Sequence, residues 1–308
     1  MSDGFAPIVL FTYNRLKNTR ETVDCLLANE EAAASDLIVY SDAPKSEAAA
    51  GSVAQLRDYL RTVSGFRSVR IVEREENYGL VRNIVSGVTE TVNRCGRVIV
   101  LEDDHSVSPY FLRYMNEGLD LLADRQDIAC IHGYVYPHKE KLPEAFLIKG
   151  ADCWGWGTWK RAWDVFNPDA AGLYREIVRQ GRQREFEFNG SYPYMKMLKN
   201  QMEGTAGSWA ICWYASAFLS NLYTVYPDVA MVRLNSLDDG GEHSSASRGM
   251  RKFSVSPSQL PLDWGKASLL EESPAGRKAF ERFFWSLKSW RERLFRLFWK
   301  KTYLCQTD

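Results

Sequence analysis

Short apolar runs alternate with amphipathic segments of helical length over the first 105 residues. The apolar runs, which are typical of buried strands, cover residues 7–12, 37–40, 69–72 and 98–101. Helices are predicted between them, over residues 18–29, 48–63 and 78–93. Strands joined by helices of this length imply βαβ crossovers. The sequence therefore predicts an α/β fold with a mixed, mostly parallel, Rossmann-like sheet flanked by helices.

Polar residues follow three of the four predicted strands at the point where each strand ends. Asn14 and Arg15 follow the first strand, Asp42 follows the second, and residues 102–104 follow the fourth. Open sheets of this kind bind ligands outside the carboxyl ends of their strands. We therefore expect these side chains to converge on one edge of the sheet.

The last of these groups, Glu102-Asp103-Asp104, places three acids at the exit of a buried strand. Like charges repel at this spacing, and burial disfavours each charged form. A divalent cation bound by carboxylate oxygens removes the conflict, whereas the alternative is an acidic turn that lies in water. The chain has no G-x-G-x-x-G and no G-x-x-x-x-G-K-[ST] segment, so a metal on this cluster is the obvious partner for any nucleotide phosphate.

Composition excludes several classes of protein. The chain has 39 basic and 39 acidic residues, so no overall positive field favours nucleic acid. Six scattered cysteines without a C-x-x-C pair argue against a zinc ribbon and fit a reducing cytoplasm. No signal peptide and no apolar window long enough to span a membrane is evident. We expect a cytoplasmic protein.

The strand-end residues have the form of a known motif set. The chain carries Thr12-Tyr13-Asn14-Arg15, then N-x-G-x-x-x-N over residues 77–83, then the acids 102–104 at the end of a strand. This pattern resembles the GT-A fold glycosyltransferases of family 2. The E-D-D form followed by x-x-V-x-P-x-F, with the later Gly155-Trp156 and Gly241–Ser244 segments, is similar to the N-acetylglucosaminyltransferase I branch of bacterial sugar transferases. The resemblance covers roughly residues 7–247.

This resemblance implies a metal-dependent glycosyltransferase that uses a nucleotide-diphosphate sugar. The positions implied to contact the donor are Thr12, Asn14, Arg15, Asp42, Asn77, Arg82, Glu102, Asp103 and Asp104. Among them, Asp104 is implied to bind Mn²⁺ or Mg²⁺, Asp103 the ribose, and Arg15 with Asp42 the base. His243 is either a further ligand of the metal or phosphate or a plain loop histidine.

An inverting transfer needs a carboxylate that takes the proton of the acceptor hydroxyl. The segment 208–213, where related eukaryotic enzymes carry acids, has none here. The remaining candidates for this base are Asp239, Glu203 and Asp152, together with Asp238. If none of them acts, the transfer is retaining or the protein is inactive.

Tryptophans and a basic tail mark the second half. Trp154, Trp156 and Trp159 either form a stacking wall for the acceptor or fill the interface between the sheet and the second half. Residues 275–304 contain nine Lys or Arg, two Glu and a broad aromatic stripe at helical spacing. Such a helix suits an anionic membrane surface, although packing on its own domain or between two subunits of a homodimer explains the stripe equally well.

We therefore expect a catalytic domain over residues 1–250, a linker over 251–274 and a basic aromatic amphipathic helix over 275–308. Within the catalytic domain, residues 1–105 form the nucleotide-binding half and 106–250 the acceptor-side half. The expected activity is an inverting hexosyl or N-acetylhexosaminyl transfer to a glycan or lipid-linked acceptor in surface polysaccharide biosynthesis, at the inner face of the plasma membrane. The alternatives are a sugar nucleotidyltransferase and an inactive protein that binds nucleotide sugars.

Overall fold

A computed structural model describes residues 4–235 and 251–288 of the chain. The strands are β1 (Ile8–Thr12), β2 (Asp36–Ser41), β3 (Ser68–Glu73), β4 (Arg97–Glu102), β5 (His105–Val107), β6 (Ile128–His132), β7 (Ala145–Lys149), β8 (Trp156–Trp159), β9 (Tyr223–Pro227), β10 (Val232–Leu234) and β11 (Ser268–Glu272). The α-helices are α1 (Leu16–Leu27), α2 (Glu47–Leu60), α3 (Gly79–Cys95), α4 (Phe111–Leu121), α5 (Lys160–Trp163), α6 (Ala170–Arg179), α7 (Gln183–Phe186), α8 (Tyr194–Met202), α9 (Trp209–Leu219) and α11 (Pro274–Leu287). Short 3₁₀ segments are η1 (Glu30–Ala34), η3 (Arg251–Phe253) and η4 (Trp264–Lys266).

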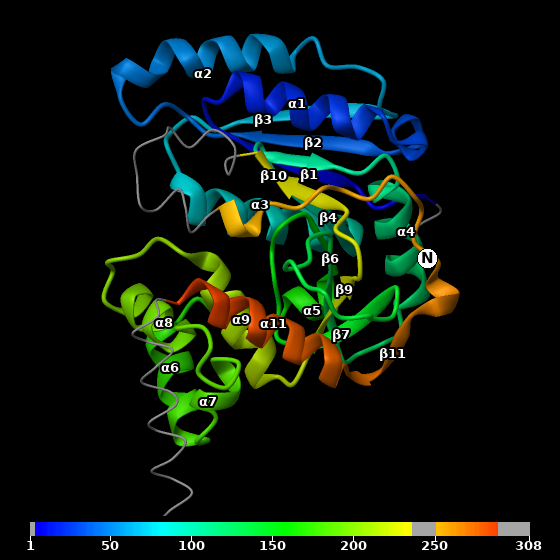
Figure 1. The fold of residues 1–308 in the computed structure, drawn as a ribbon. Coiled ribbons are helices and arrows are strands. Elements are labelled where there is room, and N and C mark those ends of the chain that lie inside the picture. The colour runs from blue at the N-terminus through cyan, green and yellow to red at the C-terminus, as the bar shows by residue number, and fades with distance from the viewer. Residues whose placement is uncertain (1–3, 236–250, 289–308) are drawn as a thin grey trace, which may run out of the picture.

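In the described residues, nine strands form one sheet in the order β11-β7-β9-β6-β8-β4-β1-β2-β3 (Figure 1). Strands β4, β1, β2 and β3 are parallel, as expected from the βαβ pattern. Strand β8 runs antiparallel to both of its neighbours, β4 and β6, and so joins this half to the rest of the sheet. The sheet is therefore mixed and mostly parallel, which confirms the predicted fold class.

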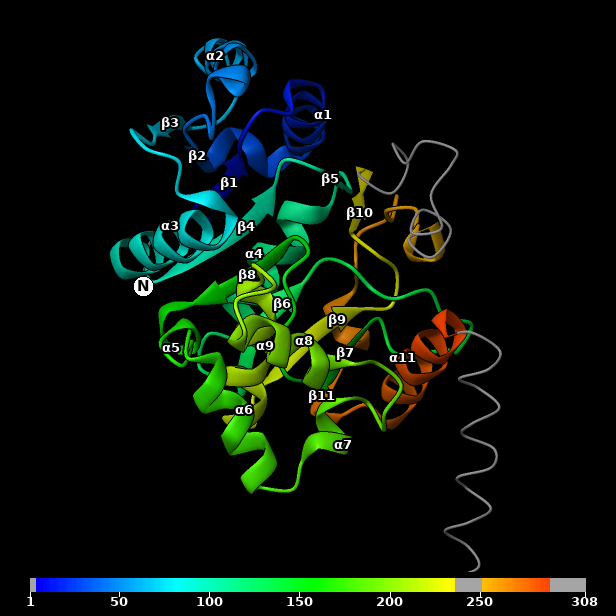
Figure 2. The ribbon, with the colours of Figure 1, turned by 90° about the vertical axis from the view of Figure 1, so that its left-hand side faces the viewer.

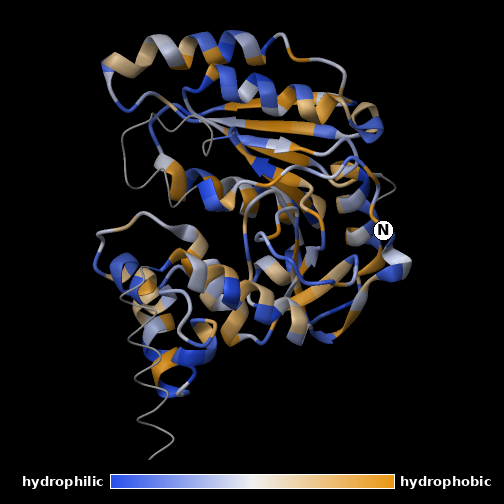
Figure 3. Ribbon diagram, viewed as in Figure 1, coloured by the Kyte–Doolittle hydropathy of each residue, from blue (hydrophilic) through white to orange (hydrophobic). Residues whose placement is uncertain are grey.

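Side chains alternate across the sheet as the period of a strand requires. In β1, Ile8 and Leu10 pack into a core that includes residues of α1, α2 and α4, whereas Val9 and Phe11 pack into a core with residues of α3, α5 and α9. Figure 2 shows these helices on the two sides of the sheet, and Figure 3 shows its strands as predominantly hydrophobic. The sheet is thus buried on both faces, which explains why its strands read as continuous apolar runs.

Helix α3 lies unusually close to the sheet at Gly87. A Cβ atom at this position would lie 2.7 Å from a ring carbon of Phe11 and 3.0 Å from one of Tyr40. Glycine is therefore required for the helix to reach the two aromatic rings that lie below it. The helix ends at Gly96, whose φ of 77° is the left-handed conformation that glycine adopts most readily.

The C-terminal part of the described chain belongs to the core. Strand β11 pairs with β7, so the expected linker over residues 251–274 includes an edge strand of the sheet. Helix α11 buries Phe280, Phe283 and Phe284, so the first part of the aromatic stripe packs on its own domain. Residues 289–308 of the predicted tail helix lie outside the described residues. Neither described range contains a helix with the length and apolar character needed to cross a bilayer.

Candidate functional site

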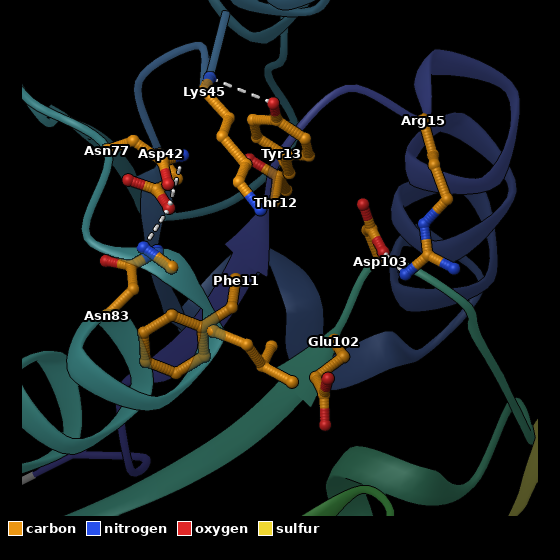
Figure 4. A pocket seen from close by; sticks show the side chains of 12 residues that line it. Phe11, Thr12, Tyr13, Arg15, Asp42, Lys45, Asn77, Asn83, Glu102 and Asp103 are labelled. Atoms are coloured by element: carbon orange, nitrogen blue, oxygen red, sulfur yellow. Dashed lines mark hydrogen bonds and ion pairs between the residues drawn. The ribbon is translucent and has the colours of Figure 1, made fainter. Parts of the chain in front are cut away.

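A cavity of about 340 Å³ opens at the carboxyl ends of β1, β2 and β4. The predicted strand-end residues meet there, as Figure 4 shows. Its lining residues are Phe11, Thr12, Tyr13, Arg15, Asp42, Lys45, Asn77, Gly79, Leu80, Asn83, Glu102 and Asp103. All of them come from the first 105 residues, and six are among the positions implied to contact the donor. We call this cavity the strand-end pocket.

Asp42 holds the loop that leads into α3. One carboxylate oxygen accepts hydrogen bonds from the backbone N–H groups of Ala43 (2.9 Å) and Tyr78 (2.8 Å). The other accepts from the N–H of Gly79 (2.9 Å) and the side-chain amide of Asn77 (3.2 Å). A carboxylate at a helix N-terminus satisfies its unpaired N–H groups and is stabilised by the helix dipole. Asp42 therefore shapes the wall of the pocket, and its contact with a base stays a prediction.

The three acids after β4 point in different directions. Asp103 is buried and forms an ion pair with Arg15, whose guanidinium also lies 3.3 Å from an oxygen of Asp104. Glu102 points the opposite way, into another part of the pocket (Figure 4). Asp104 lies beside the pocket and keeps 16% of its side chain exposed. The three carboxylates at the end of β4 therefore face different parts of the site.

Two buried oxygens at this strand end have no hydrogen-bond partner within the described parts of the chain. They are the hydroxyl oxygen of Thr12 and the second carboxylate oxygen of Asp103. Leaving a buried polar atom unpaired costs about 1–3 kcal/mol, so such atoms mark places where a ligand completes the site. Both residues line the pocket, which makes them candidate contacts for a polar ligand.

Burial changes the protonation of the acids. Burial, reinforced by the neighbouring Asp104 and Asp103, raises the pKa of Glu102 to about 8. Burial also raises the pKa of Asp103 to about 6, although the Arg15 guanidinium acts in the opposite direction. The folded protein therefore resists placing several negative charges here, which is the conflict that a divalent cation would relieve.

His105 is a buried neighbour of the acids. Its Nδ1 accepts a hydrogen bond from the Glu102 N–H at 3.2 Å, and its Nε2 lies 3.8 Å from an Asp104 oxygen. Burial lowers the pKa of His105 to about 4, so the ring is neutral at neutral pH. With Nδ1 as acceptor, Nε2 carries the proton and faces Asp104.

The residues around Asp104 can hold a cation that also binds a ligand. Across residues 4–235 and 251–288, no three or more His, Cys, Asp or Glu side chains converge as a complete metal site. Mg²⁺ bound to substrate phosphates needs only one or two protein carboxylates, because phosphate and water oxygens supply the other ligands. The partly exposed Asp104 meets that requirement. The other predicted ligand, His243, lies outside the described residues.

The raised pKa values predict that the metal-free protein loses stability as the pH rises. The folded state binds the protons of Glu102 and Asp103 up to about pH 8 and about pH 6, whereas the unfolded chain releases them near the ordinary values of 4.5 and 3.8. The contribution of these two acids to stability is therefore full below about pH 4 and is lost by about pH 8. Thermal melts in a chelator should show this decline. The decline should be shallower in Glu102→Gln, whose side chain cannot ionise, and equal slopes would contradict the prediction.

Two donor-contact candidates do not reach the pocket. Arg82 is exposed, forms an ion pair with Glu76 at 2.7 Å and stacks 3.5 Å above the ring of Tyr78. It lines a neighbouring groove with Trp209, so the prediction that it lies near the phosphates or the donor sugar is not supported by its position. Asn14 is half-buried but is not a lining residue of the strand-end pocket.

Lys45 is the clearest lining residue that sequence reasoning missed. Its side chain extends into the pocket beside Thr12, and its backbone N–H donates to the Tyr13 hydroxyl at 3.0 Å (Figure 4). Its position three residues after the strand-end Asp42 could have indicated that it lies at the same edge of the sheet. Its amine places a positive charge at the pocket, where Arg82 does not reach. Phe11, Tyr13 and Asn83 were missed as well.

The two candidates for a catalytic base that the structure describes, Glu203 and Asp152, lie in different surroundings. Glu203 is exposed and faces Lys199, whose amine lies 3.6 Å from it. Asp152 lines a second, aromatic cavity. Asp239, like Asp238, lies outside the described residues. Helix α9 begins at Trp209 and has no acid in its first turn, as the sequence indicated.

The tryptophans divide between the core and that second cavity. Trp156 and Trp159 are buried, with 1% and 5% of their surface exposed, so they fill the interior. Trp154 is half-buried and lines the cavity together with Asp152. The interior interpretation therefore holds for two of the three residues, and only Trp154 remains available for a ligand.

Comparisons with known proteins point to one family. The family model described as glycosyl transferase family 2 matches residues 8–161. No curated protein sequence matches significantly. Among solved structures, the S. aureus TarS fragment 1–349 aligns with a TM-score of 0.42 and 10% identity, covering 81% of this chain and 70% of that one. The mannosyltransferase PcManGT from Pyrobaculum calidifontis, in complex with GDP-Man and Mn²⁺, aligns with a TM-score of 0.31 and 13% identity over 42% of this chain, which spans only 35% of the mannosyltransferase.

Proposed function

Because this chain belongs to glycosyl transferase family 2, we propose that its strand-end pocket binds a nucleoside diphosphate sugar, whose sugar the enzyme transfers to a glycan or lipid-linked glycan. The observation that carries this proposal is the convergence of Asp42, Glu102 and Asp103 on one pocket at the carboxyl edge of the parallel strands. This pocket lies wholly within the part of the chain that the family match covers.

The unpaired oxygens suit the nucleoside part of the donor. The free carboxylate oxygen of Asp103 can accept a hydrogen bond from a ribose hydroxyl, and the Thr12 hydroxyl lies at the end of the neighbouring strand, β1. Lys45 supplies a positive charge at the pocket for a negatively charged ligand. This set of one acceptor, one hydroxyl and one ammonium matches a hydroxylated, anionic ligand such as a nucleotide.

Asp104 is the residue that would hold Mn²⁺ or Mg²⁺ at this site. When bound, such an ion stabilises the charge that grows on the diphosphate as the glycosidic bond breaks. Arg15 connects Asp103 to Asp104 and keeps both carboxylates in place at the pocket entrance. The Mn²⁺ in the mannosyltransferase complex is consistent with this assignment.

The finer assignments rest on sequence. The E-D-D context favours the N-acetylglucosaminyltransferase I branch and an inverting hexosyl or N-acetylhexosaminyl transfer in surface polysaccharide assembly. The second candidate is an inactive protein that binds nucleotide sugars, which is favoured by the missing acid in the first turn of α9. The family match removes the support for a sugar nucleotidyltransferase.

A thermal-shift screen of nucleotide sugars with and without Mn²⁺ tests the donor assignment. One nucleotide sugar should raise the melting temperature in an Mn²⁺-dependent way, because a ligand that binds only the folded state stabilises it. Lys45→Ala should weaken this binding by about tenfold through loss of one charge-assisted contact. The exposed Lys139 provides a matched control, Lys139→Ala, which should bind normally. If no nucleotide sugar shifts the melting temperature, the proposed function is wrong.

We also propose that the enzyme works in the cytoplasm at the inner face of the plasma membrane, because the basic and aromatic composition of residues 289–308 suits an anionic surface. The full-length chain should float with anionic vesicles, whereas a chain that ends at Lys288 should not. The shorter chain keeps the buried aromatic residues of α11, so both proteins should have the same fold. Equal flotation of the two chains, or none by either, would contradict the proposal. Vesicles of neutral lipid are the control.

A further inference from the structure

A second cavity, of about 230 Å³, lies between the sheet and the helices α8 and α9. In Figure 1 these helices and α11 lie together on the side of the molecule away from α1 and α2. Its wall is mostly aromatic and includes Tyr136, Trp154, Tyr192, Tyr194, Tyr214 and Tyr226. Among the described residues that line it, Asp152 is the one acid. We call it the Asp152 cavity.

Asp152 is fixed by hydrogen bonds. One carboxylate oxygen accepts from the hydroxyl groups of Tyr136 (2.9 Å) and Tyr226 (3.0 Å). The other accepts from the Cys153 N–H at 2.8 Å. The neighbouring His132 Nε2 itself accepts from the Trp154 N–H at 2.9 Å, so it presents no proton to Asp152. The carboxylate is therefore held rigidly and keeps one unused acceptor position on the oxygen bound to Cys153.

The carboxylate of Asp152 and the two tyrosine hydroxyls bonded to it can accept further hydrogen bonds but not donate them. Both tyrosine hydroxyl protons are used on Asp152, so the Tyr136 and Tyr226 oxygens are left with acceptor capacity only. The ligand must therefore bring donors of its own. It must also present apolar surface, because the surrounding rings are aromatic.

A sugar ring meets both requirements, since it has a C–H face for aromatic rings and hydroxyl groups that donate. An organic ammonium ion is the other chemistry that aromatic rings and a carboxylate can attract. Lys149 also lines this wall, but its amine is paired with Glu185 at 3.1 Å, so its charge does not decide between the two. The hydrogen bonds favour the sugar, because a quaternary ammonium ion brings no donor to the unused acceptor position on Asp152, whereas a sugar hydroxyl does.

The Asp152 cavity lies on the same edge of the sheet as the strand-end pocket. Strand β8 pairs with β4 so that Trp156 is opposite Val100. The chain just before β8, which contains Asp152 and Cys153, therefore passes close to Glu102, and burial with the nearby acids Asp152 and Glu102 raises the pKa of Cys153. The two cavities share no lining residue, so each can hold its own ligand.

From this arrangement we propose that the Asp152 cavity binds one neutral sugar ring of the acceptor, with Asp152 receiving a hydroxyl proton in a hydrogen bond and Trp154 packing against the ring. This inference rests on the proposed function, which assigns the strand-end pocket to the donor. We assign Asp152 a binding role, in which the hydrogen bonds from Tyr136, Tyr226 and the Cys153 N–H fix the direction of its carboxylate.

Saturation-transfer NMR on the full-length protein tests the proposal with a panel of neutral methyl glycosides and with tetramethylammonium. At least one glycoside should bind in the absence of nucleotide, and tetramethylammonium should not. Asp152→Asn and Tyr226→Phe should each weaken the glycoside by about five- to tenfold, the effect of one buried hydrogen bond. The matched controls are Asp164→Asn, an exposed acid in an ion pair with Lys160, and Tyr59→Phe in α2. Both controls should bind as the natural chain does.

Circular dichroism melts show whether each variant is folded. Tyr226→Phe changes only one hydroxyl, so it keeps the test valid if Asp152→Asn destabilises the protein. The proposal is overturned if no glycoside binds, if binding is unchanged in folded Tyr226→Phe, or if tetramethylammonium binds in place of the glycosides. Nucleotide-sugar binding with Mn²⁺, measured on the same samples, separates the two assignments. Its loss alone contradicts the donor pocket, whereas absent glycoside binding with intact donor binding contradicts only the Asp152 cavity.

Discussion

Replacing Asp104 with alanine should abolish metal-dependent turnover of the donor while leaving the fold intact. Asp104 is the partly exposed carboxylate of the cluster, 16% exposed and bridged to Asp103 through Arg15. Loss of the carboxylate that holds the cation removes the Lewis acid from the departing diphosphate, which should reduce turnover by roughly a thousandfold or more. The cost in stability should be small, because an ion pair at a partly exposed position contributes at most about 1 kcal/mol.

Release of the nucleoside diphosphate, followed over a titration of Mn²⁺, measures the effect. The matched control is Asp24→Ala, which removes an exposed carboxylate from α1 that does not line the pocket. Its turnover should equal that of the natural chain. Undiminished turnover in a folded Asp104→Ala protein would reject the metal assignment. Lost turnover together with a collapsed melting transition would contradict the expected separation of function from stability.

The second large effect is on stability. Replacing Phe280 with alanine should lower the free energy of unfolding by about 3–5 kcal/mol. Phe280 is fully buried in α11, and its ring centroid lies 4.8 Å from that of Tyr136 and 4.9 Å from that of Tyr226. Removing the ring leaves a cavity that the well-packed neighbours cannot fill.

Urea-induced unfolding followed by circular dichroism measures this loss. Phe5→Ala is the matched control, because Phe5 is 36% exposed and should cost far less. The comparison also decides whether the aromatic residues of α11 belong to the core of the domain. If Phe280→Ala were as mild as Phe5→Ala, the helix would not be part of the core, and its whole aromatic stripe would again be available to a membrane or a second subunit.

The first half of the chain could be predicted because its signals are local. The predicted strand 98–101 corresponds to β4, Arg97–Glu102, and the predicted helix 78–93 to α3, Gly79–Cys95. Runs of β-branched residues and helical spacing of apolar residues can both be recognised from neighbouring positions in the sequence. Because this sheet is buried on both faces, its strands appear as continuous apolar runs, which are easy to identify. The convergence of Asp42, Glu102 and Asp103 on one pocket followed directly from the parallel topology.

Other features depend on contacts that no local pattern records. Strand β8, Trp156–Trp159, is buried along its whole length, so its sequence shows no alternation of apolar and polar residues. Only its richness in tryptophan can be seen from the sequence, and this does not predict a strand. Strand β11 is mostly polar and joins the sheet only because it pairs with β7. The role of Asp42 was hidden for a similar reason, since three of its hydrogen-bond donors are backbone N–H groups, which any residue could provide.

Strand β8 has a consequence for how specificity can change. Its ladders to β4 and β6 connect the end of the strand that carries Glu102 to the segment that carries Asp152. The spacing between the two cavities is therefore a property of the backbone, while the wall of each is built from different side chains. Under the two proposed assignments, substitutions in the aromatic wall should alter which acceptor is chosen while nucleotide recognition stays as it is. In this architecture, new sugar linkages can evolve one cavity at a time.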